Sequence, residues 1–492
     1  MKRAVYIVIG LLSLCSSAYA QFYNHDWFIG YGNWTNKGRI VFDSTSYIFS
    51  VEQRKMGFIG TQGNICDAQG NFLMSSNGVW IANANNDTML NGSGLNPGAY
   101  TSANSNGLLI PHANVFLPFP GDSNRYVLFH HTAQNNGLYN IVYEVLYSVI
   151  DVTLDAGLGA VIQKNQLAFT DTLNWGITAC KHANGRDWWI VLQKDLTDIV
   201  FIVLFSPTGV QSISSQSLGV PIAWGNVTQP TFSPDGTKFG YTTYTPNQPD
   251  SCYAMVFDFD RCLGQFNNSR TFLLDKGILW GLSFSPNSKQ LYCNSSSHLF
   301  QIELDSGTID TVAIYDGFSF PIPSAATTFM HEYLAANGKI YLTSGNGVQH
   351  LHEINYPDSA GLACDVQQHA VSLGVWHFRA VPNHPNYNLG PEVGSVCDTL
   401  SVGLSEPAHD FRFSISPNPV SDGVVKLTYL LPQNKAGVLE VFDLTGQRVF
   451  NQQLPPWSTL QFVQLPELSS GLYTCVIRSG NEKTAKKLVV MR

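Results

Sequence analysis

Two stretches near the middle of the chain, TFSPDGTKFGYTTY at 231–244 and SFSPNSKQLYCNSS at 283–296, share one pattern. In each, a Phe-Ser-Pro-Asx turn precedes a segment rich in aromatic residues. Pro, Asx, Gly and Ser are typical of tight turns, and aromatic residues favour strands. The pattern therefore predicts that each stretch is a β-hairpin of one repeated unit.

The same turn, followed by an aromatic strand, recurs along most of the chain. The copies are DAQGNFLM, GDSNRYVLF, ANGRDWWIV, SPDGTKFGY, SPNSKQLYC and AANGKIYLT, aligned at Gly70, Asn124, Gly185, Gly236, Ser288 and Gly338 with spacings of 54, 61, 51, 52 and 50 residues. A period near 50 residues is close to that of a four-stranded propeller blade. Six units are visible, and segments 22–50 and 369–390 could jointly build another, so the sequence favours seven blades over six.

The composition agrees with a fold made of short strands. The chain has 492 residues, of which 44% are hydrophobic and 13% charged, with 42 Gly and 29 Phe. This usage suits many strands and tight turns better than helices. We therefore predict an all-β fold: a six- or seven-bladed β-propeller at 21–390, a linker at 391–410, and a small β-sandwich at 411–492.

The FSPDG and FSPNS turns resemble β-propeller repeats of the TolB type. The stretch NICDAQGNFLMSSNGVWIANANNDTMLNG also resembles the opening blade of large secreted propeller proteins from Bacteroidetes. The resemblance covers most of residues 22–390. It implies a propeller fold and does not name a ligand, because one fold hosts many functions.

The first twenty residues are typical of an export signal. Lys2 and Arg3 form a charged start, an apolar run covers 4–15, and Ala18-Tyr19-Ala20 resembles a cleavage site. The apolar run is shorter than the ~20 residues that span a bilayer, and no later segment comes closer. We therefore expect residues 1–20 to be a signal peptide and the mature chain to lack a transmembrane segment.

The last eighty residues contain four elements that resemble one known family in order. They are a Pro-Asn-Pro element, a strand-turn-strand around Thr445-Gly446, a Gly-x-Tyr element, and a terminal basic-apolar strand. The residues concerned are Pro417, Asn418, Pro419, Gly446, Gly471, Tyr473, Lys486 and Lys487. Together they resemble the type A C-terminal sorting domain of the type IX secretion system. The resemblance implies the type IX machinery as a partner, and export across the outer membrane to the medium or the cell surface.

Each of these elements also has a simpler structural explanation. Prolines fix an extended backbone, glycine permits a tight approach, and lysines keep an edge strand soluble. These roles explain folding, but they do not explain why such a domain stands last in the chain.

The charge distribution and the motif content of the sequence argue against several classes of function. The segment 411–492 has nine Lys and Arg against five Asp and Glu, whereas 1–410 has 18 against 30. An acidic body lacks the clustered cations that phosphate contacts need, so we expect no nucleic-acid partner. The sequence contains no GxSxG, HExxH, Walker A, GxGxxG or calcium-loop motif, and it predicts no metal and no cofactor.

Two groups of polar residues are candidates for binding. Lys181, His182 and Arg186 surround a predicted turn beside two tryptophans, which could place them at the mouth of the propeller. Asp258 and Asp260 alternate on a predicted strand, so both face one side, where they could bind a cation or act as acid and base. The competing interpretations are a blade turn with packing tryptophans and a structural salt bridge. No residue is assigned as catalytic.

Eight cysteines remain after the signal, and none is in a CxxC pair. In an exported protein the usual alternative to metal ligation is disulfide formation. Cys252 with Cys262 and Cys364 with Cys397 are the candidate pairs, although sequence alone cannot assign connectivity.

From these observations we expect an exported propeller, displayed at the cell surface, that binds a glycan or a protein and is not an enzyme. The alternative is a secreted hydrolase or lyase acting on polysaccharide or peptide, with His182 or Asp258 among its site residues. A structural envelope component is a third possibility.

Overall fold

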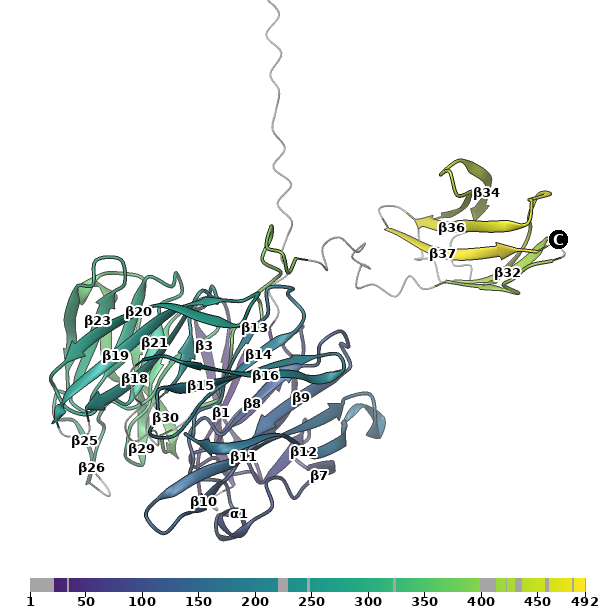
Figure 1. Cartoon of the computed structure of the whole chain (residues 1–492). Helices are drawn as coiled ribbons and strands as arrows, with labels where there is room; N and C mark the ends of the chain where they lie inside the picture. The colour runs from purple at the N-terminus through teal and green to yellow at the C-terminus, as the bar shows by residue number, and fades with distance from the viewer. Residues whose placement is uncertain are drawn as a thin grey trace, which may run out of the picture. The chain divides into compact units, whose positions relative to one another are not determined.

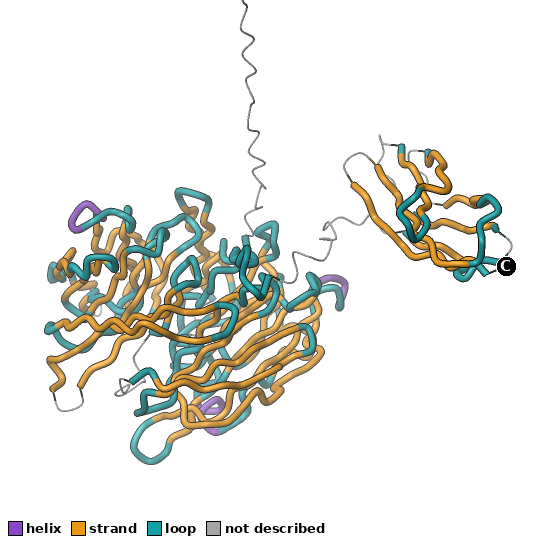
Figure 2. Tube along the Cα trace, turned by 45° about the horizontal axis from the view of Figure 1, so that its top comes forward, coloured by secondary structure: helices purple, strands orange, loops and turns teal. Residues whose placement is uncertain are grey.

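The computed structural model of this chain consists mainly of strands (Figures 1 and 2). It describes residues 22–32, 35–219, 229–245, 248–321, 324–379, 381–398, 413–421, 423–429, 436–455, 460–479 and 482–491. The predicted signal peptide at 1–20 lies outside these residues. The chain divides into two compact units, 1–400 and 401–492.

The first unit is a β-propeller. Its described part contains seven sets of three to five antiparallel strands that follow one another along the chain, besides one short hairpin; a single parallel bridge joins the second and third sets into one nine-stranded sheet. This arrangement confirms the all-β propeller and agrees with the preference for seven blades. The first set of strands is β1–β3, the second is β4–β7, and the third consists of β8, β9, β11 and β12. Their bounds are β1 Asp26–Ile29, β2 Asn36–Phe42, β3 Tyr47–Gln53, β4 Gly63–Cys66, β5 Phe72–Ser76, β6 Trp80–Asn83, β7 Thr88–Ser93, β8 Asn114–Pro118, β9 Arg125–His130, β11 Asn140–Asp151 and β12 Ala160–Leu173.

The other four sheets are β13–β16, β17–β20, β21–β24 and β27–β30. Their bounds are β13 Thr178–Lys181, β14 Trp188–Gln193, β15 Ile199–Ser206, β16 Gly209–Ser217, β17 Thr231–Phe232, β18 Lys238–Thr245, β19 Gln248–Asp260, β20 Gln265–Leu274, β21 Gly281–Phe284, β22 Gln290–Asn294, β23 His298–Glu303, β24 Ile309–Ile314, β27 Glu332–Leu334, β28 Ile340–Leu342, β29 Val348–Ile354 and β30 Val366–His377.

Several short elements lie outside the main strands of this ring. They are the helix α1 (Ala99–Ala103), the strand β10 (Ala133–Asn135) paired with β11, the hairpin β25 (Ser319–Pro321) and β26 (Ser324–Ala326), and two short 3-10 turns at Asp155–Gly157 and Gly361–Cys364.

Hydrophobic clusters join each sheet to the next around the ring. One large cluster links the sheets of β4–β7, β8–β12 and β13–β16, and three more link successive sheets as far as β27–β30. Trp27 and Ile29 of β1 then pack with Tyr341 and Leu351 of the last sheet. Phe28, on the opposite face of β1, packs with the following sheet through a separate cluster. Because strand side chains alternate between faces, one short strand closes the ring from both sides.

The recurring turn has the same hydrogen bonds in six blades, between the first and second strand of each. An Asx side-chain oxygen accepts a backbone N–H from the residue two positions later, which is a local alternative to a backbone turn. The residues are Asp67, Asp122, Asn184, Asp235, Asn287 and Asn337. We call the end of the propeller that they define the turn face.

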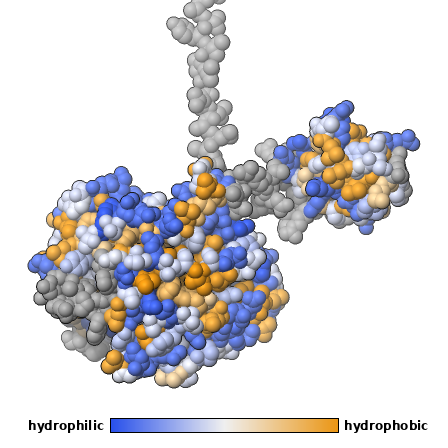
Figure 3. All heavy atoms as spheres, viewed as in Figure 1, coloured by the Kyte–Doolittle hydropathy of each residue, from blue (hydrophilic) through white to orange (hydrophobic). Residues whose placement is uncertain are grey.

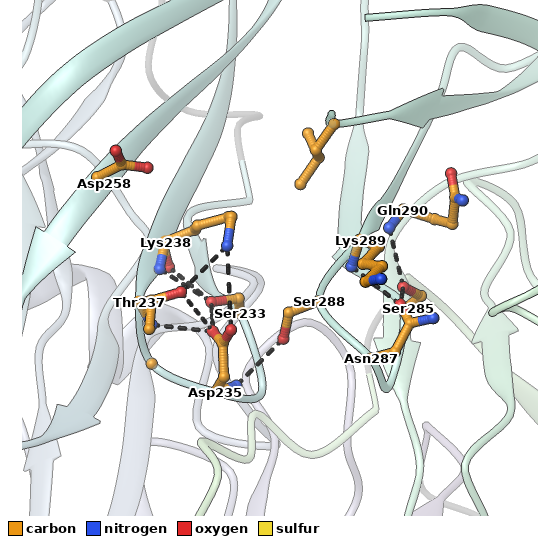
Figure 4. Close-up of polar contacts among 12 residues, drawn as sticks. Ser233, Asp235, Thr237, Lys238, Asp258, Ser285, Asn287, Ser288, Lys289 and Gln290 are labelled. Atoms are coloured by element: carbon orange, nitrogen blue, oxygen red, sulfur yellow. Dashed lines mark hydrogen bonds and ion pairs between the residues drawn. The ribbon is translucent and has the colours of Figure 1, made fainter. Parts of the chain in front are cut away.

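Figure 4 shows two of these turns side by side. Asp235 accepts from Ser233 Oγ at 2.5 Å and from the backbone N–H of Thr237 at 2.9 Å, and the Ser285–Asn287 pair repeats this geometry. The backbone N–H of Asp235 also donates to Ser288 Oγ at 3.2 Å, which ties neighbouring blades together.

The chain leaves the propeller along residues 381–398, which we call the exit segment. Val381 packs with Trp27 and Ile29, so the start of this segment lies beside β1. Strand β30, by contrast, pairs with β29 in the preceding blade. Among the described residues the closing blade is therefore the three-stranded sheet β1–β3, and residues 369–377, predicted to help build it, belong to β30 of the preceding blade.

The second unit consists of two facing sheets around its own core, which confirms the predicted small sandwich. One sheet has the order β31-β32-β35 and the other β34-β33-β36-β37, and they enclose residues such as Leu439, Val463, Ile477 and Leu488. The bounds are β31 Ser414–Ser416, β32 Val424–Thr428, β33 Gly437–Phe442, β34 Arg448–Leu454, β35 Leu460–Gln464, β36 Gly471–Ser479 and β37 Glu482–Val490.

Candidate functional site

A pocket of about 360 Å³ lies among the first strands of several blades, where the axis of the ring runs. We call it the channel pocket. Its walls come from β13, β17, β21, β27 and the exit segment, and exposed Phe22, Ser44 and Asn388 form its rim. The lining includes His25, Thr178, Gln229, Pro230, Thr231, Phe232, Ser283, Pro286, Glu332, Pro382, Asn383, His384, Pro385 and Asn386. The volume falls within the range of small-molecule sites.

Glu332 is the acidic residue of this pocket, and its side chain is buried. Oε1 accepts a hydrogen bond from Asn294 Nδ2 at 2.6 Å, whereas Oε2 has no partner among the described residues. Burial raises the pKa of this carboxyl to about 8, against the opposing effect of the Asn294 bond. At neutral pH the group is therefore mostly protonated and can donate as well as accept.

Gln229 holds three blades together at the pocket. Its Oε1 accepts the backbone N–H groups of Glu332 at 3.0 Å and Leu282 at 3.3 Å, and its Nε2 donates to the carbonyl of Glu332. At Gly281 the blades come close enough that an added Cβ would lie 2.3 Å from the carbonyl oxygen of Met330. Both features fix the wall of the pocket.

The exit segment forms the other wall through amide side chains. Asn383 Nδ2 donates to the carbonyl oxygens of Ile177 at 2.7 Å and Asn114 at 3.3 Å, and Asn386 Nδ2 donates to Pro234 at 2.6 Å. His384 bonds to the hydroxyl of Tyr387 at 3.1 Å, and burial lowers its pKa to about 3. Sequence reasoning missed Gln229, Glu332, Asn383 and His384, because nothing local marks which strands lie innermost.

The first predicted group, Lys181, His182 and Arg186, lies in the turn between β13 and β14, where it has internal partners. Lys181 Nζ lies 4.9 Å from the centre of the Trp188 ring, and burial, with the nearby Arg261 charge, lowers its pKa to about 8. His182 Nδ1 accepts the backbone N–H of Asn184, and burial lowers its pKa. Arg186 forms a bidentate ion pair with Asp187. These contacts order the turn.

The second predicted group, Asp258 and Asp260, shares a face of β19 and lines an open groove of about 400 Å³. Glu392, Ser395 and Val396 of the exit segment form the opposite side of this outer groove. Asp258 pairs with Arg270 at 3.5 Å, and Asp260 accepts the backbone N–H groups of Cys262 and Leu263. Arg261 follows Asp260 directly and donates to the carbonyls of Lys181, His182 and Gly390. Since Gly390 belongs to the exit segment, both predicted groups lie beside that segment.

The disulfide of the structure joins Cys262 to Cys397, with the two Cα atoms 5.6 Å apart. The predicted pairs, Cys252 with Cys262 and Cys364 with Cys397, are both wrong. Cys252 lies in β19 eight residues before the strand ends at Asp260, roughly 26 Å at ~3.3 Å per residue, whereas Cys262 lies just past that end, so the two are beyond the reach of a disulfide. Cys364 is buried between the last two blades. The bond attaches the chain at Cys397 to the propeller, within the segment 391–410 that the sequence predicts to be a linker.

In the second unit, the predicted sorting residues support the last strand and one hairpin turn. Asn418 Nδ2 donates to the carbonyl of Lys487, and its Oδ1 accepts the N–H of Val489, both at 2.8 Å. Gly446 has a φ of +82° in a turn ordered by Asp443. The Tyr473 hydroxyl donates to the carbonyl of Ser469 at 3.0 Å. Tyr473 is the buried member of this group, whereas Pro417, Asn418, Pro419, Gly446, Gly471, Lys486 and Lys487 are exposed.

Replacing Asn418 by Ala is expected to loosen β37, because two hydrogen bonds that join it to the Pro-Asn-Pro element are lost. At about 1 kcal/mol for each bond, the second unit should lose up to about 2 kcal/mol of stability. Hydrogen exchange at the amides of 486–490 in the full chain measures this, and Asn451→Ala on β34 is the matched control. Unchanged exchange in Asn418→Ala would show that the element does not hold the strand.

A comparison with protein families matches residues 414–491 to the secretion system C-terminal sorting domain. The C-terminal unit is a type IX sorting domain. Such a sorting domain indicates export across the outer membrane to the cell surface or the extracellular space. No curated protein matches the chain.

Several solved structures are similar to most of this chain at low sequence identity. A periplasmic gluconolactonase from Pseudomonas aeruginosa is 13% identical, with a TM-score of 0.40 over 72% of this chain and 98% of that one. A 6-phosphogluconolactonase described as putative, from Bacteroides uniformis, is 13% identical, with a TM-score of 0.32 over 89% and 100%. A hypothetical selenium-binding protein from Sulfolobus tokodaii is 8% identical, with a TM-score of 0.40 over 74% and 92%. At these values no activity transfers to this chain.

The described residues contain no group of three or more His, Cys, Asp and Glu side chains arranged to hold a metal ion. In the same part of the chain, no helix has both the length and the apolar character needed to cross a membrane.

Proposed function

We propose that this chain is an exported, cell-surface-displayed propeller that binds a glycan or protein ligand without transforming it. The sorting domain supplies the export, and the channel pocket supplies the binding site. The observation that supports this proposal best is the composition of the pocket, in which neutral hydroxyl and amide side chains line a preformed cavity. Such a lining orients a ligand by hydrogen bonds.

The two predicted groups have different places in this proposal. The outer groove with Asp258 and Asp260 is the second surface that we propose for ligand contact, because it is open and lies beside the exit segment. Lys181, His182 and Arg186 are proposed to keep the mouth of the propeller in shape through their internal contacts.

Incubating the purified full chain with a glycan array and with surface-protein extracts is expected to give saturable binding to at least one class without release of product. Product release is measured in the same wells. The control is a chain heated past unfolding, which should not bind. A chain that retains no glycan and no surface protein would contradict the binding function.

A hydrolase or lyase is the second candidate, and one observation favours it. Glu332 combines burial, a pKa raised to about 8 by that burial, and a place in a cavity, and perturbed carboxyls of this kind cluster at active sites. Product release that Glu332→Gln abolishes, with folding intact, would establish the enzyme function and overturn our proposal.

A further inference from the structure

The described residues that line the channel pocket carry no fixed charge of either sign at neutral pH. They include no Lys, Arg or Asp. Burial lowers the pKa of both lining histidines, His25 and His384, and raises that of Glu332, so all three titratable side chains are mainly uncharged. An ionic group that entered would lose its hydration without gaining a counter-charge, which is costly.

Neutral polar groups surround the pocket on several sides. Thr178, Thr231 and Ser283 belong to the first strands of three successive blades, and Asn383 and Asn386 face them from the exit segment. Hydroxyl groups both donate and accept, whereas a carboxylate accepts only. Because the donors of Asn383 are held by backbone carbonyls, its side-chain oxygen is the group left to accept from a ligand. This mixture suits a molecule with several adjacent hydroxyl groups.

The spaces between these polar groups are apolar. Pro230, Pro286, Pro382 and Pro385 contribute flat, rigid surfaces, and half-buried Phe232 adds an aromatic ring. Surfaces of this kind pack against C–H groups, and they lose little conformational freedom on binding because proline is already fixed. The lining therefore combines hydrogen-bonding groups with apolar surface, as a sugar ring combines hydroxyl groups with C–H groups.

We infer that the channel pocket takes a neutral polyhydroxylated ligand, namely the end of an uncharged saccharide, in preference to an anionic sugar, an amine or a peptide. This inference rests on the proposed function and names the ligand class of the same site. Thr231 and Ser283 bind the sugar hydroxyls, Glu332 contributes a neutral carboxyl, and the prolines contact the ring.

The test is calorimetric titration of the full chain with neutral methyl glycosides of common hexoses, with glucuronate as the anionic probe and glucosamine as the cationic probe. At least one neutral glycoside should bind, and at least tenfold more tightly than either charged probe. Tighter binding of a charged probe, or no binding of any neutral glycoside, would overturn the inference.

Three variants locate the bound sugar. Thr231→Val removes one hydroxyl at constant shape and should weaken binding about fivefold, the effect of one hydrogen bond. Thr271→Val, on the outer strand of the same blade, is the matched control and should leave binding unchanged. Affinity of the natural chain should fall above pH 8 as Glu332 ionises, whereas Glu332→Gln has no proton to lose at this position, so its affinity should stay constant between pH 7 and 9. Equal effects of both threonine variants, or an identical pH profile for Glu332→Gln and the natural chain, would place the sugar elsewhere.

The outcomes separate this inference from the proposed function. If the chain binds surface proteins or charged glycans on the array while neutral glycosides fail in the titration, the binding function stands and the ligand class is wrong. If nothing binds in either experiment, both fail together.

Discussion

Replacing Cys397 by Ser is expected to give the largest loss of stability of any single surface change in the propeller. The bond between Cys262 and Cys397 closes a loop with a sequence separation of 135 residues. Loop-closure entropy for a loop of this size corresponds to at most about 5 kcal/mol. Denaturant unfolding of the full chain, followed by tryptophan fluorescence, measures the change.

A structural consequence accompanies the loss. Without the disulfide, the C-terminal end of the exit segment keeps the bond from Arg261 to the carbonyl of Gly390 and the bond from the Glu392 N–H to Ala183. Because the covalent link is lost, we expect the backbone amides at this end to exchange their hydrogens faster. Reductant is the internal control: it should lower the stability of the natural chain and leave that of Cys397→Ser unchanged. Equal stability of the two proteins under oxidising conditions would contradict this account of the disulfide.

Acidification from pH 6.5 to 5 is expected to destabilise the propeller strongly, because it contains several buried neutral histidines. Burial lowers the pKa of six of them to about 3 or 4 and that of the seventh, His112, well below its usual value. The other six are His130, His131, His331, His352, His377 and His384. Their hydrogen bonds, such as the 2.6 Å contact of His112 with the Tyr333 hydroxyl, join neutral partners.

The direction of the effect follows from proton linkage. The unfolded chain binds protons at these histidines below a pKa of about 6.5, whereas the folded chain binds them only at a lower pH, near 3 to 4 for all of them except His112, whose pKa is also lowered. Stability is therefore complete above pH 6.5 and falls as the pH falls, by about 2 kcal/mol for each histidine at pH 5. Protonation of three or four such histidines therefore costs as much free energy as the whole unfolding free energy of a typical domain.

The free energy of unfolding, measured at half-unit steps from pH 7.5 to 5, gives the number of protons taken up. We expect a steep positive slope against pH below 6.5, and a shallower slope in His130→Asn, which removes one buried imidazole. A flat profile between pH 6.5 and 5 would show that these histidines are accessible to protons in the folded chain.

The turns explain why the fold was predictable from the sequence. Each Asx residue at Asp67, Asp122, Asn184, Asp235, Asn287 and Asn337 orders its own turn through bonds to residues within a few positions. Such local chemistry leaves a mark in the sequence at every blade, so the period and the blade preference could be predicted.

The site depends on contacts that leave no local mark. Gln229 binds the backbone at Glu332, 103 positions later, and Asn383 binds that at Asn114, 269 positions earlier. The sequence around Glu332 has no feature that distinguishes it from other strands. Its carboxyl is buried because its strand lies on the inner side of its blade. The disulfide was mispredicted for the same reason, since the path of the exit segment across the turn face brings Cys397 to Cys262.

The exposed surface gives less information about function than the channel does. In the view of Figure 3, hydrophobic residues lie in patches among hydrophilic ones on both units. Several single exposed residues, including Leu138, Leu362 and Val393, belong to loops. The channel pocket is therefore the feature on which the proposed binding function depends most.

The most direct test of that claim is a crystal structure of the full chain soaked with the neutral glycoside that binds best. We predict density for a sugar ring in the channel pocket, between Thr231 and Ser283 on one side and the amide of Asn383 on the other. Density for the sugar in the outer groove or on the blade edges, with the channel pocket holding only water, would contradict the account.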